Sequence, residues 1–167
     1  MALQKIVSGG QTGVDRGALD GALDAGFCCG GWCPKGRIAE DGPIPEHYLM
    51  VEMISAGYEE RTLKNVLDSD GTAILHYGVL EGGTRLTKEY CDAHGKPCET
   101  VDASNATPEA AAAAIAAFID RHRISTLNVA GPRASKWPGA RDYARQTLRL
   151  VIAGACAPAP ADRPGRP

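Results

Sequence analysis

Short apolar runs alternate with amphipathic segments along most of the chain. The apolar run 5–7 breaks into the glycine-rich stretch 8–13, and apolar residues then recur at helical spacing from Val14 onward. This pattern predicts a strand, a tight turn and a helix that ends at Gly26.

The same order of elements recurs further along the chain. The predicted elements after the first unit are a strand at 27–31, a helix at 58–69, a strand at 71–77, a helix from about 82 to 94, a strand at 96–101, a helix at 107–123, a strand at 127–130 and a helix at 139–153. Prolines and glycines across 32–45 predict a long loop without regular structure, and long ordered loops are often functional.

Alternating strands and helices predict an α/β fold, because such a chain forms a parallel sheet through right-handed crossovers. We expect a single doubly wound Rossmann-like domain, with a mainly parallel sheet and helices on both faces. The domain is assigned to residues 1–154, and the proline- and alanine-rich segment 155–167 is expected to be a disordered tail. Alternation alone leaves the strand order open.

The composition fits one soluble globular unit. The chain has 167 residues, of which 44% are hydrophobic and 23% charged, enough for one substantial core. The formal charge of -2 gives no overall attraction to nucleic acid or to an acidic membrane surface. No apolar stretch is long enough for a membrane helix and no signal peptide is evident, so a cytoplasmic protein is expected.

Six cysteines raise the question of disulfides or a metal site. Cys28 and Cys29 are adjacent and Cys33 follows four residues later, which does not match the paired spacing of zinc ribbons. We therefore expect reduced thiols, with Cys28 and Cys29 as small apolar residues of a buried strand. Cys33 is the one cysteine whose expected loop position allows a direct role at a binding site.

Three glycine-bearing turns are expected to share one edge of the sheet, because every strand-to-helix turn of a parallel sheet lies at its carboxyl edge. These turns lie at 9–13, 82–84 and 131–135, and an arginine stands at or near each one: Arg16, Arg85 and Arg133. Helix N-termini with nearby arginines form an anion receptor. The alternative is three independent turns that need glycine only for packing.

The first turn matches neither common phosphate-binding motif. The window from Ser8 lacks the first glycine of a dinucleotide fingerprint, and Gly13 is followed by Val14-Asp15 instead of the lysine of a Walker A loop. Lys35 and Arg37 of the long loop are further cations that could face an anion. The candidate binding residues are Ser8, Gly9, Gly10, Gln11, Thr12, Gly13, Asp15, Arg16, Lys35, Arg37, Gly82, Gly83, Thr84, Arg85, Gly131, Arg133, Ser135 and Lys136. No catalytic residue and no metal ligand is assigned.

Several motifs together resemble the molybdenum carrier proteins, a family of the Rossmann-like SLOG superfamily. The match covers about 4–152. Its motifs are Ser8-Gly9-Gly10-Gln11-Thr12-Gly13-Val14-Asp15, Gly31-Trp32-Cys33-Pro34-Lys35-Gly36-Arg37 with Ala39-Glu40-Asp41-Gly42, Glu60-Arg61-Thr62 with Asn65-Val66 and Ser69-Asp70-Gly71-Thr72, Gly82-Gly83-Thr84, and Asn128-Val129-Ala130-Gly131-Pro132-Arg133. The resemblance implies a homo-oligomer that binds molybdenum cofactor, a phosphate-bearing pterin that holds molybdenum through a dithiolene. It places the binding edge at the glycine-rich turns, and molybdoenzymes would be the recipients of the cofactor.

Two other functions stay open. Related SLOG proteins that hydrolyse nucleoside monophosphates carry Pro-Gly-Gly-x-Gly-Thr-x-x-Glu at the corresponding turn, whereas here Thr87 stands three residues after Thr84. A hydrolase would therefore lack that carboxylate, although Asp15, Glu40, Asp41 and Asp70 are acids that could lie near the edge. A nucleotide-sensing module cannot be separated from a carrier by sequence.

Overall fold

The computed structural model describes residues 3–156, and its centre is a parallel six-stranded sheet in the order β5-β2-β1-β8-β6-β7. The strands are β1 (Lys5–Val7), β2 (Cys29–Cys33), β5 (Met50–Glu52), β6 (Gly71–His76), β7 (Cys98–Asp102) and β8 (Thr126–Ala130), and a separate antiparallel hairpin consists of β3 (Ile38–Ala39) and β4 (Gly42–Pro43). The predicted doubly wound α/β fold is confirmed.

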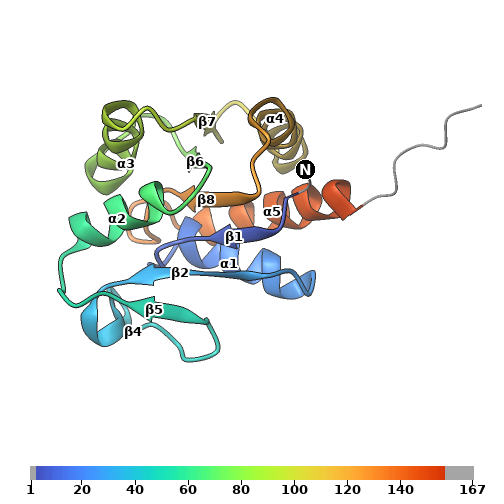
Figure 1. Ribbon diagram of the computed structural model, residues 1–167. Helices are drawn as coiled ribbons and strands as arrows, with labels where there is room; N and C mark the ends of the chain where they lie inside the picture. The colour runs from blue at the N-terminus through green and yellow to red at the C-terminus, as the bar shows by residue number, and fades with distance from the viewer. Residues whose placement is uncertain (1–2, 157–167) are drawn as a thin grey trace, which may run out of the picture.

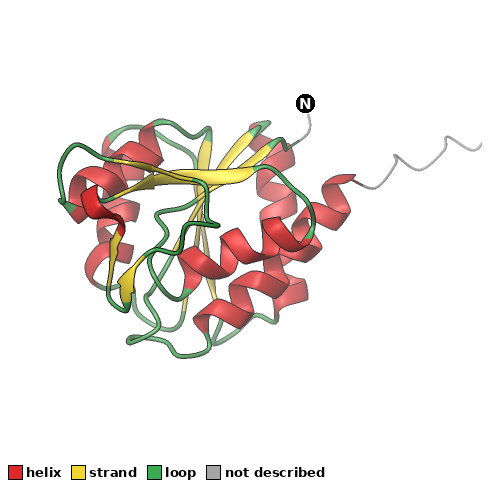
Figure 2. Ribbon diagram, turned by 90° about the horizontal axis from the view of Figure 1, so that it is seen from below, coloured by secondary structure: helices red, strands yellow, loops and turns green. Residues whose placement is uncertain are grey.

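Helices cover both faces of the sheet (Figures 1 and 2). They are α1 (Val14–Asp24), α2 (Tyr58–Leu67), α3 (Gly82–Ala93), α4 (Pro108–His122) and α5 (Ala140–Cys156), with a short 3-10 turn, η1 (Lys35–Arg37). Helix α5 packs between α1 and α4 on one face, while α2 and α3 contact each other on the opposite face. Helix α3, which follows β6, and helix α5, which follows β8, thus lie on opposite faces of the sheet.

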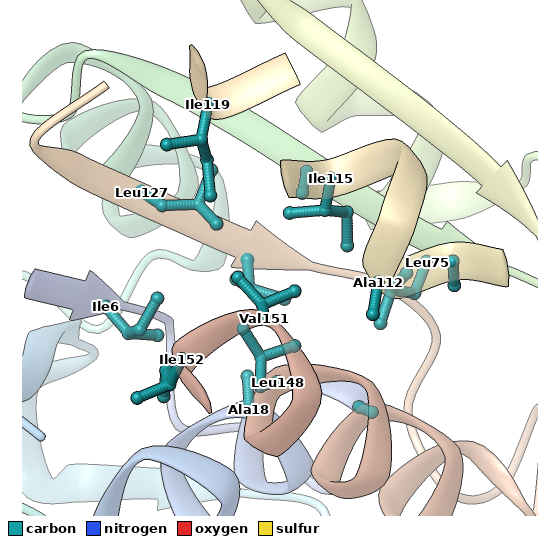
Figure 3. Close-up of a cluster of buried hydrophobic side chains, with 14 of the residues drawn as sticks. Ile6, Ala18, Leu75, Ala112, Ile115, Ile119, Leu127, Leu148, Val151 and Ile152 are labelled. Carbon is teal, nitrogen blue, oxygen red and sulfur yellow. The ribbon is translucent and has the colours of Figure 1, made fainter. Parts of the chain in front are cut away.

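The main core lies between the sheet and the layer of α1, α4 and α5 (Figure 3). Aliphatic side chains from the strands meet those of the helices there, among them Ile6, Leu75, Ala112, Ile115, Leu127, Leu148, Val151 and Ile152. Fully burying an aliphatic side chain of this size contributes about 1.5–3 kcal/mol. This contact fixes the positions of the strands whose carboxyl ends surround the site.

Two glycines let α1 and α5 pack at close range. A Cβ atom added at Gly17 would lie 2.3 Å from the carbonyl oxygen of Arg141, and one added at Gly21 would lie 2.7 Å from that of Arg145. The backbones of the two helices therefore approach each other closely along one turn of α1, where any larger residue would force the helices apart.

Several element boundaries differ from the predictions. The second strand lies at 29–33 rather than 27–31, so Cys28 is exposed before it, Cys29 is half-buried and Cys33 is a buried strand residue rather than a loop residue. The segment 32–45 was expected to be irregular, but it contains η1 and the β3-β4 hairpin. Strand β5 was not predicted, because its three residues carry too short a pattern.

The C-terminal boundary is also later than expected. Helix α5 continues to Cys156, so residues 155 and 156 belong to the helix and not to a tail, and the rest of the expected disordered tail, 157–167, lies outside the described residues. Helix α5 begins after β8 and runs back across the sheet, so its end and Leu3 both lie at the amino edge of the strands (Figure 1). Between residues 3 and 156, no helix combines the length and the apolar character needed to cross a membrane.

The α1-α5 contact predicts the outcome of a matched pair of substitutions. Gly17→Ala is expected to lower the free energy of unfolding by about 1–3 kcal/mol, because its methyl group would overlap α5. Gly154→Ala, in α5 with no atom within 4 Å of the added carbon, is expected to be neutral or to raise it by up to about 1 kcal/mol. Urea unfolding of both variants measures this, and equal losses would contradict the packing explanation.

Candidate functional site

A cavity of about 560 Å³ lies at the carboxyl ends of β1, β6 and β8, beside α2. It lies where the neighbouring strands β6 and β8 lead to opposite faces of the sheet, into α3 and α5 (Figure 1). Divergent connections at the carboxyl edge are the usual ligand position of such folds, and the volume suits a small molecule. Residues from four segments line the cavity: 9–15, 61–65, 77–87 and 128–137.

The N-terminus of α3 provides an open backbone surface on the cavity. Gly82 and Gly83 are exposed residues of its first turn, and a Cβ added at either one would meet no atom within 4 Å. Gly82 has a φ of 49°, which explains its lack of a side chain, but Gly83 has no such conformation. Packing therefore gives no reason for glycine at 83, whereas the close approach of a ligand to the first amides of the helix does.

The glycines of the other two turns have a different role. A Cβ added at Gly13 would lie 2.3 Å from the carbonyl oxygen of Pro132, and one added at Gly131 would lie 2.2 Å from that of Leu75. Gly13 allows the connections after β1 and β8 to touch, and Gly131 allows the connection after β8 to pack against strand β6. Packing thus accounts for the first and third turns, while the second is the one left open toward the cavity.

Two cations of the loop after β8 reach the same cavity. Arg133 and Lys136 are exposed, and neither forms an ion pair with a residue in the described range 3–156. The Arg133 guanidinium carbon lies 5.9 Å from the centre of the Tyr58 ring, within the range of a cation–π contact. Both charges are therefore available to an anion bound at α3.

A buried ion pair forms the opposite wall. The Arg61 Nη1 atom of α2 lies 3.1 Å from Asp15 Oδ2 of α1, and the two side chains are 11% and 7% exposed. Burial raises the pKa of Asp15 above its usual value, against the opposing effect of Arg61. A Cβ at Gly9 would lie 1.2 Å from Arg61 Nη1, so a side chain at this position would displace the Arg61 guanidinium from the pair.

Gln11 lies beside this pair with a fixed amide orientation. Its Oε1 atom accepts hydrogen bonds from the backbone N–H groups of Thr12, at 3.0 Å, and Glu40, at 2.9 Å. Its Nε2 atom and the Nε atom of Arg61 are buried and have no hydrogen-bond partner among the described residues. An unpaired buried donor costs about 1–3 kcal/mol, so these two atoms lower the stability of this wall of the cavity.

Aromatic side chains form another part of the wall. Tyr77 and Trp137 both line the cavity, with ring centres 5.7 Å apart, and Trp137 also packs 5.3 Å from Tyr143. Val79, which is 81% exposed, lies on the same segment as Tyr77. This apolar surface suits the face of a planar ring.

The hairpin tip between β3 and β4 fastens the first turn to the loop after β8. Glu40 accepts hydrogen bonds from the hydroxyl groups of Thr12 and Ser135 and from the Ser135 N–H. The next residue, Asp41, forms a two-pronged ion pair with Arg16, with distances of 2.5 and 2.8 Å. Thr12, Arg16, Glu40 and Asp41 also line a smaller cavity of about 290 Å³ on the far side of the first turn.

The predicted site residues fall into two groups. The residues that line the large cavity are Gly9, Gln11, Asp15, Gly82, Gly83, Thr84, Gly131, Arg133, Ser135 and Lys136. The residues that lie outside it are Ser8, Gly10, Thr12, Gly13, Arg16, Lys35, Arg37 and Arg85. The shared carboxyl edge thus brings together residues of all three turns.

Most residues outside the cavity have partners in the protein. Ser8 donates its hydroxyl hydrogen bond to the Val129 carbonyl at 2.7 Å. Arg37 donates to the carbonyl oxygens of the segment 44–48, and Arg85 is paired with Glu89 one turn along α3, at 3.3 Å. Lys35 is exposed in η1.

Helix α2 contributes cavity residues that were not assigned to the site. Arg61 and Asn65 lie one turn apart on the same face, a spacing visible in the sequence, but nothing in the sequence indicates that this face points at the carboxyl edge. Asn65 also pairs through its amide with the Trp32 backbone, at 2.9 and 3.0 Å, which joins α2 to β2. Apart from their position near glycine-rich turns, no sequence pattern indicates that Tyr77 and Trp137 line the cavity.

Cys33, which had been considered for a direct role, does not line the cavity. It is buried in a second apolar cluster with Leu19, Ile44 and Tyr48, and burial raises the pKa of its thiol. In the described part of the chain, no group of three or more histidine, cysteine or acidic side chains is placed to hold a metal ion.

Comparison with known proteins links this geometry to a family. The model of the circularly permutated YpsA SLOG family matches residues 6–152. The crystal structure of a "Putative molybdenum carrier protein" from Syntrophus aciditrophicus SB is 46% identical in sequence, with a TM-score of 0.88, over 90% of this chain and 96% of that one. No curated protein matches the chain.

The Glu40 contacts predict a pH-dependent stability. Partial burial raises the pKa of Glu40, but hydrogen bonds from Ser135 and Thr12 outweigh it and leave the pKa below its usual 4.5. A carboxylate with a lowered pKa stabilises the fold above the unfolded-state pKa and loses that contribution as the pH falls through its folded-state pKa. The melting temperature of the wild type is expected to exceed that of Glu40→Gln most at pH 7, and the difference should shrink below about pH 4.5.

Glu46→Gln is the matched control, since Glu46 is an exposed glutamate of the same segment and forms no side-chain hydrogen bond within the range 3–156. Thermal unfolding followed by circular dichroism between pH 3.5 and 7 gives the comparison. A constant difference between wild type and Glu40→Gln across that range would contradict the assignment.

Proposed function

The chain belongs to the circularly permutated YpsA SLOG family, and from this we propose that it is a carrier of molybdenum cofactor, which it holds by its phosphate-bearing pterin in the large cavity. The name of the similar Syntrophus protein supports a molybdenum-related ligand. The observation that carries the proposal is the open first turn of α3, where Gly82 and Gly83 present amides to the cavity. Metal and pterin are cargo here, not a resident cofactor.

The phosphate is assigned to α3 because a helix N-terminus provides both donors and a favourable dipole for an anion. Arg133 and Lys136 add positive charge from the opposite loop, on a chain whose formal charge is -2. The attraction is therefore local to the cavity and not a property of the whole surface.

The pterin is assigned to the wall of Tyr77 and Trp137, which offers a surface for a planar ring. The described cysteines do not line the cavity, so the protein supplies no thiolate to the metal in this proposal. We further propose that the carrier is a cytoplasmic homo-oligomer that delivers the cofactor to molybdoenzymes and binds neither nucleic acid nor membranes.

A nucleotide hydrolase is the second candidate, and Asp15 is the observation in its favour. Its buried carboxyl group lines the cavity with a raised pKa, a property of many catalytic acids. Against it, Thr87 stands where the related hydrolases carry glutamate, and its hydroxyl group donates to the Gly83 carbonyl at 2.8 Å. Asp15 is also held by Arg61. A nucleotide sensor would use the same cavity and differ only in its partner.

Co-purification tests the carrier proposal. Protein from a host that synthesises molybdopterin is expected to contain molybdenum, measured by elemental analysis, and a phosphorylated pterin, measured by mass spectrometry. Gly83→Ala should lower both by at least about tenfold, because the methyl group would lie over the amides, while the free energy of unfolding stays equal or rises by up to about 1 kcal/mol.

An arginine pair provides the matched control. Arg133→Ala should also reduce the bound pterin, by about tenfold, the loss expected for one charged contact. Arg85→Ala should leave it unchanged, because Arg85 is an exposed arginine outside the cavity. Equal effects of the two arginine variants, or no effect of Gly83→Ala, would remove the α3 site.

Incubation with adenosine monophosphate separates the carrier from the hydrolase. The carrier proposal expects no free adenine, measured by liquid chromatography after prolonged incubation, since Thr87 stands where the related hydrolases carry their glutamate. Adenine release that is lost in Asp15→Asn would support the hydrolase in place of the carrier.

A further inference from the structure

One aromatic ring joins the beginning of α2 to the loop after β8. Tyr58 is the first residue of α2 and is 38% exposed. The guanidinium carbon of Arg133 lies over this ring, 5.9 Å from its centre, and that of Arg61 lies over the same ring at 6.0 Å. Arg61 and Arg133 both line the large cavity, whereas Tyr58 does not. Tyr58 thus contacts two cavity residues without lining the cavity itself.

Arg61 connects the Tyr58 ring to the interior of the protein. Its Nη1 atom pairs with Asp15 Oδ2 at 3.1 Å, and the two side chains are 11% and 7% exposed. Arg61 follows Tyr58 by three residues on α2, a spacing at which two side chains of a helix are neighbours. The charge of Arg61 is therefore balanced by Asp15, and the Tyr58 ring lies against a side chain that is itself fixed.

Arg133 carries a positive charge that no carboxylate of the described residues pairs with. Its side chain is exposed, but its backbone is held in the loop, because its carbonyl oxygen accepts from the Lys136 N–H at 3.0 Å. The backbone therefore fixes where this long side chain starts. The Tyr58 ring is the group that its guanidinium contacts in place of a carboxylate.

Contact with an aromatic ring leaves a guanidinium group able to bind an anion. The ring attracts the cation through its π face, whereas the guanidinium donates hydrogen bonds from N–H groups that lie in its own plane. Phosphate is bound by such in-plane donation from two N–H groups at once. A long side chain that is already ordered also loses less conformational freedom when the ligand binds. The contact with Tyr58 therefore prepares Arg133 to bind an anion in the cavity.

We infer that Tyr58 is a positioning residue for ligand binding: its ring holds the Arg133 guanidinium at the cavity, where that group binds the anionic end of the ligand. This inference rests on the proposed function, since it takes the anion to be a phosphate at the first turn of α3. Tyr58 acts on the ligand through Arg133 and makes no contact with the ligand itself.

Calorimetric titration of the full chain with hydroxymethylpterin and with its monophosphate tests the inference, because these probes share a ring and differ by the phosphate. Tyr58→Leu is expected to weaken binding of the monophosphate about two- to fivefold, the range of an exposed cation–π contact, and to leave binding of the unphosphorylated pterin unchanged. Tyr58→Phe retains the aromatic face and should bind both probes as wild type does. A loss in Tyr58→Phe as large as that in Tyr58→Leu would overturn the inference.

A double-mutant cycle separates positioning from direct contact with the ligand. In the Arg133→Ala background, Tyr58→Leu is expected to cause no further loss of affinity for the monophosphate, because the group that Tyr58 positions is gone. Tyr90→Leu is the matched control, since it makes the same change at a tyrosine of α3 that does not line the cavity, and it should leave both affinities unchanged. An equal loss from Tyr58→Leu with and without Arg133, or an equal loss for both probes, would overturn the inference.

The positioning role and the proposed function fail in distinguishable ways. If Gly83→Ala and Arg133→Ala weaken binding of the monophosphate but Tyr58→Leu does not, the phosphate site stands and the role of Tyr58 is wrong. If wild type binds the monophosphate no more tightly than hydroxymethylpterin, the phosphate site at α3 is overturned, and the role of Tyr58 with it.

Discussion

The backbone contact between the first glycine turn and the loop after β8 is the constraint on which the site depends. The Val14 N–H donates to the Pro132 carbonyl at 3.1 Å, and the Ala134 N–H donates to the Thr12 hydroxyl group at the same distance. Glycine at 13 and 131 leaves the space for this contact. The connections after β1 and β8 touch each other. The connection after β6 stands apart from them, and together with α3 it lines the open cavity.

The pattern of charges follows from the same packing. Arg16, Arg141 and Arg145 pair with Asp41, Asp20 and Asp24, at 2.5, 2.7 and 2.6 Å, around α1 and its neighbours. These pairs neutralise three basic residues on the α1-α5 side of the sheet. The exposed charges of Arg133 and Lys136 are then concentrated at the cavity, where low-dielectric walls strengthen their effect on an anion.

The sequence predicts the architecture better than it predicts the role of each residue. Alternating apolar patterns locate every major strand and helix except β5, and the geometry of parallel sheets places the three turns on one edge. The pattern cannot tell a paired arginine from a free one: Arg16 and Arg133 look alike beside their turns, but the partner of Arg16 is 25 residues away in a hairpin that was expected to be irregular. Likewise, only the fold shows that Gly13 fits against another backbone while Gly83 meets open space. Arg61 was not assigned to the site because α2 follows a long connection, and no local sequence pattern specifies where that connection places the helix.

The positions of the chain ends bear on how such a site can be inherited. The described chain begins and ends at the amino edge of the strands (Figure 1). The cavity lies at their carboxyl edge. Consider a rearrangement that joins the two chain ends and opens the chain between a helix and the strand that follows it. It would make and break peptide bonds only at the amino edge, opposite the cavity. Each of the connections that follow β1, β6 and β8 would stay continuous. The order in which the strands are encoded can therefore change in this fold without cutting any of the three connections that line the cavity.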